Sequence, residues 1–242
     1  MLPEKYYLQL FGWLMSDLTV VYITLNRTPE GWRKFHMGHL LRAIKDNPVI
    51  SVSREPMDFG NNIIDTETPC YSNIYRQLLR ASKLATTEFI ATAEDDVLYP
   101  EEHFREFRPN NDEFSYNRSR WSIFSWEGKN AIYCLRNRIS NCSLIAPRKL
   151  LIEALEERFK RYEGQVIPES LMGECGRNKL ESQMGITLRK QIDWWSTCPI
   201  IHMNHSDGTD ERQATKWKSH GQLKALDVPY WGKASDLAMR YS

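Results

Sequence analysis

The sequence predicts an α/β fold built on a mixed, mainly parallel sheet. Three observations carry this prediction. The β-branched run from Leu18 to Leu25 has no polar face, which is typical of a central strand covered on both sides. A helical segment from Glu30 to Lys45 and a short strand from Pro48 to Ser53 follow it, in the order of a βαβ unit. A second apolar run, Phe89 to Ala93, leads directly into three consecutive acids.

Composition sets the outer bounds. The chain has 242 residues, 41% of them hydrophobic and 26% charged, which is enough for one large domain with an ample core. A net charge of +1 gives no overall attraction to nucleic acid or membranes. There is no apolar run of the ~18 residues that a membrane helix needs, and no basic leader. The five cysteines show no C-x-x-C spacing, which disfavours a disulfide framework or a zinc site. We therefore expect a cytoplasmic protein. It could also be a virus-encoded protein that acts in a host cell.

A second helix is predicted before the acidic stretch. Residues Tyr71 to Ala85 place Ile74, Leu78 and Ala81 on one helical face. The preceding segment, Glu55 to Thr68, contains Gly-Asn-Asn and predicts a loop. Neither G-x-G-x-x-G nor a Walker A motif follows a predicted strand, which disfavours dinucleotide enzymes and P-loop ATPases.

The second half of the chain has a different character. The polar stretch from Arg108 to Arg118 predicts a loop-like junction. Trp121 to Trp126 and Ala131 to Leu135 predict a β-hairpin, and Asn141 to Ala146 predicts a further strand. An amphipathic helix is predicted from Arg148 to Tyr162, after a proline.

Three adjacent carboxylates, Glu94, Asp95 and Asp96, follow the buried strand. They repel one another, and burial disfavours their charged forms. A divalent cation offsets both effects, because carboxylate oxygens are hard ligands that suit Mg²⁺ or Mn²⁺. The alternative is a solvated acidic turn after the strand.

The stretch FIATAEDDVLYP, Phe89 to Pro100, resembles the Glu-Asp-Asp form of the DXD motif in GT-A glycosyltransferases such as those of family 2. The order of segments matches that family over roughly residues 18–210. The resemblance implies that Asp96 ligates Mn²⁺ or Mg²⁺, which grips the diphosphate of a nucleotide sugar, with a UDP-sugar favoured. It also implies that Glu94 and Asp95 contact the ribose or metal-bound water.

The same resemblance implies a single GT-A domain. A Rossmann-like half that binds the nucleotide sugar would occupy residues 1–115, and a smaller acceptor half residues 116–210. A basic tail or lid, residues 211–242, would complete it.

In open parallel sheets, ligands bind beyond the carboxyl ends of the strands. That rule places Thr24, Asn26 and Arg27, and then Arg54, at one rim of the sheet. The resemblance implies that these residues bind the base, ribose and phosphates of the donor. Arg27 could instead pair with Glu55, and Asn26 could simply cap the next helix.

Inverting members of the family use a carboxylate base in the acceptor half, which takes the proton from the attacking hydroxyl. The candidates are Glu174, Glu169 and Glu181. Gly173-Glu174 resembles the start of the family's motif, so Glu174 is favoured, although Cys175 stands where a second acid is often found. The alternatives are ordinary surface glutamates, or a retaining enzyme that needs no such base.

GT-A enzymes often add a late histidine to the metal. His202 and His205 fall near the end of a predicted strand, and alternation along it would point them to opposite faces, so one of them is expected to bind, with His205 favoured. In related enzymes a C-terminal segment contacts the diphosphate, a role implied here for Arg212 and Lys216. Nucleic-acid contact and solvated surface are the alternatives for this tail.

The function predicted from the sequence is transfer of a sugar from a nucleotide-diphosphate donor to a hydroxyl acceptor. The chain also resembles small virus-encoded enzymes that glycosylate hydroxymethylated DNA bases, which makes such DNA one acceptor and a polysaccharide or small molecule another. A nucleotidyltransferase and a non-catalytic nucleic-acid-binding module are the rivals. A DNA-binding surface would draw on four arginines: Arg118, Arg120, Arg136 and Arg138.

Overall fold

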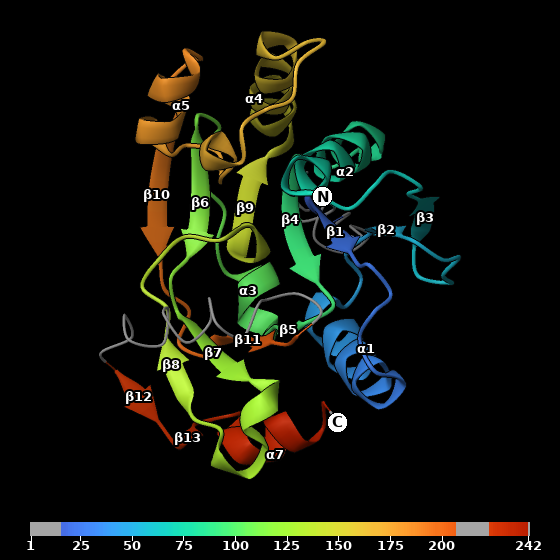
Figure 1. Cartoon of the computed structure of the whole chain (residues 1–242), viewed down its shortest axis with the longest axis vertical. Coiled ribbons are helices and arrows are strands. Elements are labelled where there is room, and N and C mark those ends of the chain that lie inside the picture. Colours follow the sequence, from blue (N-terminus) through green and yellow to red (C-terminus); the bar gives the residue numbers. More distant parts are fainter. Residues whose placement is uncertain (1–15, 207–222, 242) are drawn as a thin grey trace, which may run out of the picture.

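The structure is a computed structural model that describes residues 16–206 and 223–241. Its larger sheet consists of β1 (Leu18–Ile23), β2 (Val49–Ser53), β3 (Asn61–Ile64), β4 (Phe89–Glu94), β6 (Glu113–Asn117), β9 (Leu144–Pro147) and β10 (Lys190–Trp194). The strand order is β10-β6-β9-β4-β1-β2-β3 (Figure 1). Strand β9 runs antiparallel to both neighbours, and the other adjacent pairs are parallel. The predicted α/β fold with a mixed, mainly parallel sheet is confirmed.

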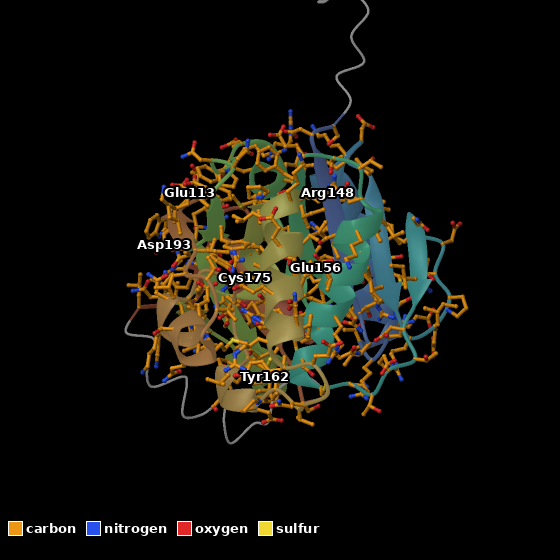
Figure 2. All side chains as sticks on the ribbon, turned by 90° about the horizontal axis from the view of Figure 1, so that it is seen from above. Glu113, Arg148, Glu156, Tyr162, Cys175 and Asp193 are labelled. Carbon is orange, nitrogen blue, oxygen red and sulfur yellow. The ribbon has the colours of Figure 1, made fainter. Side chains whose placement is uncertain are left out.

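Four helices cover this sheet: α1 (Glu30–Ile44), α2 (Tyr71–Leu84), α3 (Glu101–Arg105) and α4 (Arg148–Arg161). Helices α1 and α3 share one core with the sheet, and α2 and α4 share the other; Figure 2 shows α2 and α4 side by side over the strands. Strand β1 sends Leu18, Val20 and Tyr22 into the first core and Val21 and Ile23 into the second. Both of its faces are therefore buried, as the apolar run predicts.

A second sheet of five strands lies at the end of the first: β5 (Val97–Leu98), β7 (Arg120–Phe124), β8 (Tyr133–Leu135), β11 (Ile200–Asn204) and β12 (Lys224–Ala225) (Figure 1). The other elements of the described residues are α5 (Asn178–Met184), α7 (Ala234–Met239), a small ribbon of β13 (Asp227–Val228) and β14 (Gly232–Lys233), and three 3₁₀ helices, η2 (Ser125–Asn130), η3 (Asn141–Ser143) and η4 (Glu169–Leu171). Strand β7 pairs antiparallel with β8, which confirms the predicted hairpin. Because β4 ends at Glu94 and β5 begins at Val97, the acidic triplet lies where the two sheets meet.

Two strands lie in segments that the sequence predicts as loops. Strand β3 falls in the 55–68 segment. It is an edge strand that begins with two asparagines, so its sequence lacks the alternation of apolar and polar residues that predicts a strand. Strand β6 falls in the 108–118 segment, where Ser115 and Asn117 are fully buried. Ser115 donates to the Ile145 carbonyl and Asn117 donates to Ser196, so polar residues occupy a central strand because each is hydrogen-bonded.

The apolar face predicted for α2 is also rotated. Ile74 is 37% exposed, whereas Asn73 and Gln77 are buried beside Leu78 and Ala81. The reason is the buried carboxylate of Asp65, to which both amides donate.

The division into two halves stays a prediction, since the larger sheet takes strands from both sides of residue 115. None of the helices in the described ranges is long and apolar enough to span a membrane.

Ile145 tests the packing of β9. It is fully buried between β4 and β6, paired with Ala91 and Ser115. We expect Ile145→Ala to lower the free energy of unfolding by about 2–5 kcal/mol, because it leaves a cavity in the core. Chemical denaturation would measure the loss. Leu41→Ala, at a side chain 51% exposed on α1, should change stability by less than about 0.5 kcal/mol; equal losses would contradict this packing.

Candidate active site

The backbone of the acidic triplet is held from two directions. From α1, the indole Nε1 of Trp32 donates to the Asp95 carbonyl at 2.8 Å, and His36 Nε2 lies 2.8 Å from the Val97 carbonyl. Burial lowers the pKa of His36 to about 4, so this histidine is neutral and donates from Nε2. From β11, the Met203 amide donates to the Asp96 carbonyl at 2.8 Å. The turn that carries the acids is therefore fixed between a helix and the second sheet.

Two of the three carboxyl groups, those of Glu94 and Asp95, are disfavoured in their charged forms. Burial and then the charges of Asp96 and Asp95 raise the pKa of Glu94 to about 8. Burial and Asp96 raise the pKa of Asp95 to about 7, although Asp95 Oδ2 accepts from Thr24 Oγ1 at 2.5 Å and more weakly from Thr28 Oγ1 at 3.5 Å. Near neutral pH, burial and mutual repulsion therefore disfavour full ionisation of Glu94 and Asp95, and added positive charge would favour it.

Both late histidines approach the same carboxylate oxygen. His202 Nε2 lies 3.0 Å and His205 Nε2 3.7 Å from Asp96 Oδ2. Burial acts to raise the pKa of Asp96, but these histidines outweigh it and the pKa lies below its ordinary value. The predicted placement on opposite faces is wrong, because β11 ends at Asn204 and strand alternation does not extend to His205.

The neighbours of His202 decide which of its ring nitrogens carries the proton. Arg120 Nη1 lies 3.4 Å from His202 Nδ1, and a guanidinium can only donate. Nδ1 therefore accepts, and Nε2 carries a hydrogen that it donates to Asp96. Metal ligation by His202 Nε2 would require this hydrogen to move to Nδ1, which faces Arg120, and this favours His205 as the ligand.

A cavity of about 450 Å³ opens beside the triplet. It lies at the carboxyl ends of β1 and β4, where the sheet topology predicts a ligand site. Seven of the predicted site residues line it: Thr24, Arg27, Glu94, Asp95, Asp96, Glu169 and His205. Its other wall is the start of α2 and the residues before it: Pro69, Cys70, Tyr71, Asn73, Ile74 and Gln77.

Asn26 and Arg54, both predicted to bind the donor, do not line this cavity. Asn26 has φ +58°, and its Oδ1 accepts from the backbone N–H groups of Arg54 at 2.8 Å and Glu55 at 3.1 Å. The Arg54 guanidinium donates to the Glu67 carbonyl and lies 3.9 Å from Asp65 Oδ2. These residues join the ends of β1 and β2 and so shape the rim.

The three candidate bases have different surroundings. Glu169 lines the cavity. Glu174 pairs with Arg177 at 3.0 Å, and its charge adds to the rise in the pKa of Glu94 after burial, Asp96 and Asp95. Glu181 is 1% exposed, and its oxygens accept from the backbone N–H groups of Gly176 and Arg189 at 2.7 and 2.9 Å. Glu181 therefore holds a loop together, and its burial leaves no access for an acceptor.

Two further sets of predicted residues remain. Arg212 and Lys216, predicted to contact the diphosphate, lie outside the described residues. Of the proposed DNA-contacting arginines, Arg120 is 0% and Arg136 6% exposed. Arg118 pairs with Asp193 at 2.7 Å. Sequence reasoning treated these as surface charges and missed Trp32 and His36, although their i, i+4 spacing on a helix places them on one face.

A metal ion would have to complete its coordination from the ligand or from water. Within the described ranges, no group of three or more His, Cys, Asp and Glu side chains is arranged to hold one. Asp96 and His205 supply one carboxylate and one imidazole, a donor set that suits Mn²⁺. The raised pKa values of Glu94 and Asp95 show a local need for positive charge, so the residues present fit a divalent cation.

No protein-family model and no curated protein matches the sequence. Solved structures of low similarity include a glycosyltransferase involved in glycosylation of the major capsid of PBCV-1, at 11% identity and a TM-score of 0.45, covering 84% of this chain and 99% of that one. A second is a mannosyltransferase from Pyrobaculum calidifontis in complex with GDP-Man and Mn²⁺, at 12% identity and a TM-score of 0.42, covering 83% of this chain and 59% of that one. A third is a Drosophila galactosyltransferase 7 mutant in complex with manganese, UDP-Gal and xylobiose, at 10% identity and a TM-score of 0.37, covering 82% of this chain and 79% of that one.

Likeness at this level establishes no activity or substrate. The geometry of the chain's own cavity has to carry any functional conclusion.

The raised pKa values predict a pH dependence. Glu94 keeps its proton in the folded state up to about pH 8 but loses it near pH 4.5 when unfolded, so the free energy of unfolding should fall as pH rises from 5 to 8. The slope from this group is at most about 1.4 kcal/mol per pH unit. Saturating Mn²⁺ should counter the fall.

Denaturant titrations at several pH values, with and without Mn²⁺, would measure this. Glu94→Gln, which has the same shape and no charge, should flatten the profile. An identical pH profile for the native protein and this variant would contradict the electrostatic account of the triplet.

Proposed function

We propose that the protein is a metal-dependent glycosyltransferase that moves a sugar from a nucleotide-diphosphate donor to a hydroxyl acceptor. The observation that carries the proposal is the cavity at the carboxyl ends of β1 and β4, bordered by Glu94 and Asp95, whose pKa values are raised, and by Asp96 and His205. A diphosphate is an anion, and an anion enters such a site together with a cation. This is the GT-A arrangement that the acidic motif resembles.

In this proposal Asp96 and His205 would hold Mn²⁺ or Mg²⁺, which would supply positive charge to the diphosphate and to the leaving nucleotide. Thr24 donates a hydrogen bond to the Asp95 carboxylate. Arg27 is exposed, lines the cavity and makes no ion pair with any described residue, so its guanidinium is available for a phosphate. A UDP-sugar is the donor to test first.

The proposed chemistry is inverting. The acceptor oxygen forms a bond to C1 of the sugar as the bond from C1 to the diphosphate breaks, and a carboxylate takes the hydroxyl proton. Glu169 lines the cavity and is the candidate best supported by position. Glu174, which the sequence favours, would first have to leave Arg177.

The acceptor is proposed as a hydroxyl compound, with a hydroxymethylated DNA base and a saccharide as the two classes to screen. Burial of Arg120 and Arg136 removes much of the basic surface that a DNA contact would use, which favours the saccharide or a small molecule. No described feature favours a non-catalytic nucleic-acid-binding module, because that reading leaves the acidic triplet without a role.

Thermal stabilisation by nucleoside diphosphates tests the proposal. At 100 times its Kd, a ligand that binds the folded state adds about 2.7 kcal/mol, which raises the Tm of a protein of this size by roughly 5–10 °C. We expect such a rise with one nucleotide, UDP first, in the presence of Mn²⁺ and a much smaller rise without it. Asp96→Ala should abolish the response.

Asp58→Ala is the matched control, because Asp58 is exposed and lies outside the cavity. It should respond like the native protein. A folded native protein that responds to no nucleotide in the presence of Mn²⁺ would rule out the proposed function.

The two candidate bases are separated by their effect on turnover. We expect Glu169→Gln to lower kcat about 10²–10⁴-fold with little change in donor Kd, because a neutral amide cannot accept the proton. Glu174→Gln should change kcat much less. The opposite ranking would return the role to Glu174, and unchanged kcat in both variants would contradict inverting chemistry with either base.

A further inference from the structure

A second buried acid lies behind the α2 wall of the cavity. Asp65 is 1% exposed and follows β3. Its Oδ2 accepts from Asn73 Nδ2 at 2.7 Å and from Gln77 Nε2 at 2.5 Å, and its Oδ1 pairs with Arg80. Burial acts to raise the pKa of Asp65, but Arg80 and the two amides outweigh it, so the pKa lies below its ordinary value and the group stays ionised.

An ionised carboxylate can only accept hydrogen bonds, so it fixes the orientation of both amides. Each amide must turn its NH₂ group toward Asp65 and its carbonyl oxygen away from it. Asn73 and Gln77 are one helical turn apart on α2, and both line the cavity. The carboxylate therefore determines which polar atoms this wall presents.

The carbonyl oxygen of Asn73 has no partner of its own. Asn73 is 4% exposed and its Oδ1 is buried without a hydrogen bond. Gln77 is 2% exposed and lines the same cavity, although its Oε1 is not one of the buried atoms that lack a hydrogen bond. A buried carbonyl without a donor is unfavourable, so a ligand that brings an N–H or O–H group to it gains that interaction.

We propose that Asp65 is a positioning residue that orients Asn73 and Gln77 to recognise a hydrogen-bond donor on the nucleotide sugar. This rests on the proposed function and names the specificity-determining wall of the same cavity. The group recognised is an N–H or O–H, supplied either by the nucleoside or by the transferred sugar. Groups that offer only acceptors at this position are rejected, because they would face two fixed carbonyl oxygens.

The test compares affinities of three kinds of probe in the presence of Mn²⁺: inorganic pyrophosphate, a nucleoside diphosphate, and its sugar conjugate. UDP with UDP-glucose and GDP with GDP-mannose are the pairs to use. We expect Asn73→Ala to weaken the nucleotide or the sugar conjugate by about 3- to 10-fold, as for loss of one hydrogen bond. Pyrophosphate affinity should stay unchanged, because pyrophosphate has no group to place against α2.

Asp65→Asn keeps the shape of the side chain but adds an NH₂ group, so the amides are no longer held in one orientation. It should reduce the preference for the bound nucleotide over pyrophosphate by a similar factor. Asn62→Ala is the matched control: Asn62 on β3 donates to Ser51 and Ser53, and it does not line the cavity. It should lower stability without changing the affinity ratios.

The outcomes separate cleanly. A loss already seen with the diphosphate assigns the contact to the nucleoside, and a loss confined to the conjugate assigns it to the sugar; both support the proposal. Equal weakening of all probes, pyrophosphate included, or an effect no larger than that of Asn62→Ala, would overturn it while leaving the proposed function intact. If no probe binds the native protein, the proposed function fails, and this inference fails with it.

Discussion

Confinement of three consecutive carboxyl groups between two sheets is the constraint on which the rest of the structure depends. Strand β4 is buried up to Ala93, and β5 is buried from Val97, so the acids stay partly buried at the junction and reach solvent only through the cavity. The neighbouring elements stabilise the acidic turn in two ways. Neutral donors from α1 and from β11 fix the backbone carbonyls of the turn. Histidines from the far end of the chain reach the last carboxylate.

The topology explains how residues so distant in sequence meet there. Strand β5 leaves the larger sheet directly after the acids and pairs antiparallel with β11, which brings His202 opposite Val97. The short second sheet thereby holds the acidic turn in place. The cavity then lies on the other side of the same turn, against the start of α2. The acids are thus shared between the second sheet and an open binding surface.

Sequence patterns predicted the parts that hydrophobic burial determines. Strands β1 and β4 and the helices around them follow from apolar runs and helical spacing, and the acids at the end of β4 follow from adjacency alone. Strand β6 and the true buried face of α2 were missed because Ser115, Asn117, Asn73 and Gln77 are polar residues that tertiary hydrogen bonds bury. The placement of the two histidines depended on where β11 ends, and single-sequence patterns locate strand ends poorly.

Contrast between two buried acid sites shows why the triplet, and not every buried acid, is a candidate for chemistry. Asp65 is at least as buried as the triplet, but Arg80 and two amides supply its donors and its pKa is lowered. Glu94 and Asp95 have fewer donors and a charged neighbour, and their pKa values rise instead. Burial alone therefore does not mark a functional carboxylate. A functional carboxylate is indicated instead by a buried negative charge that the protein's own groups do not compensate. A cation that enters with an anionic ligand can supply the missing positive charge.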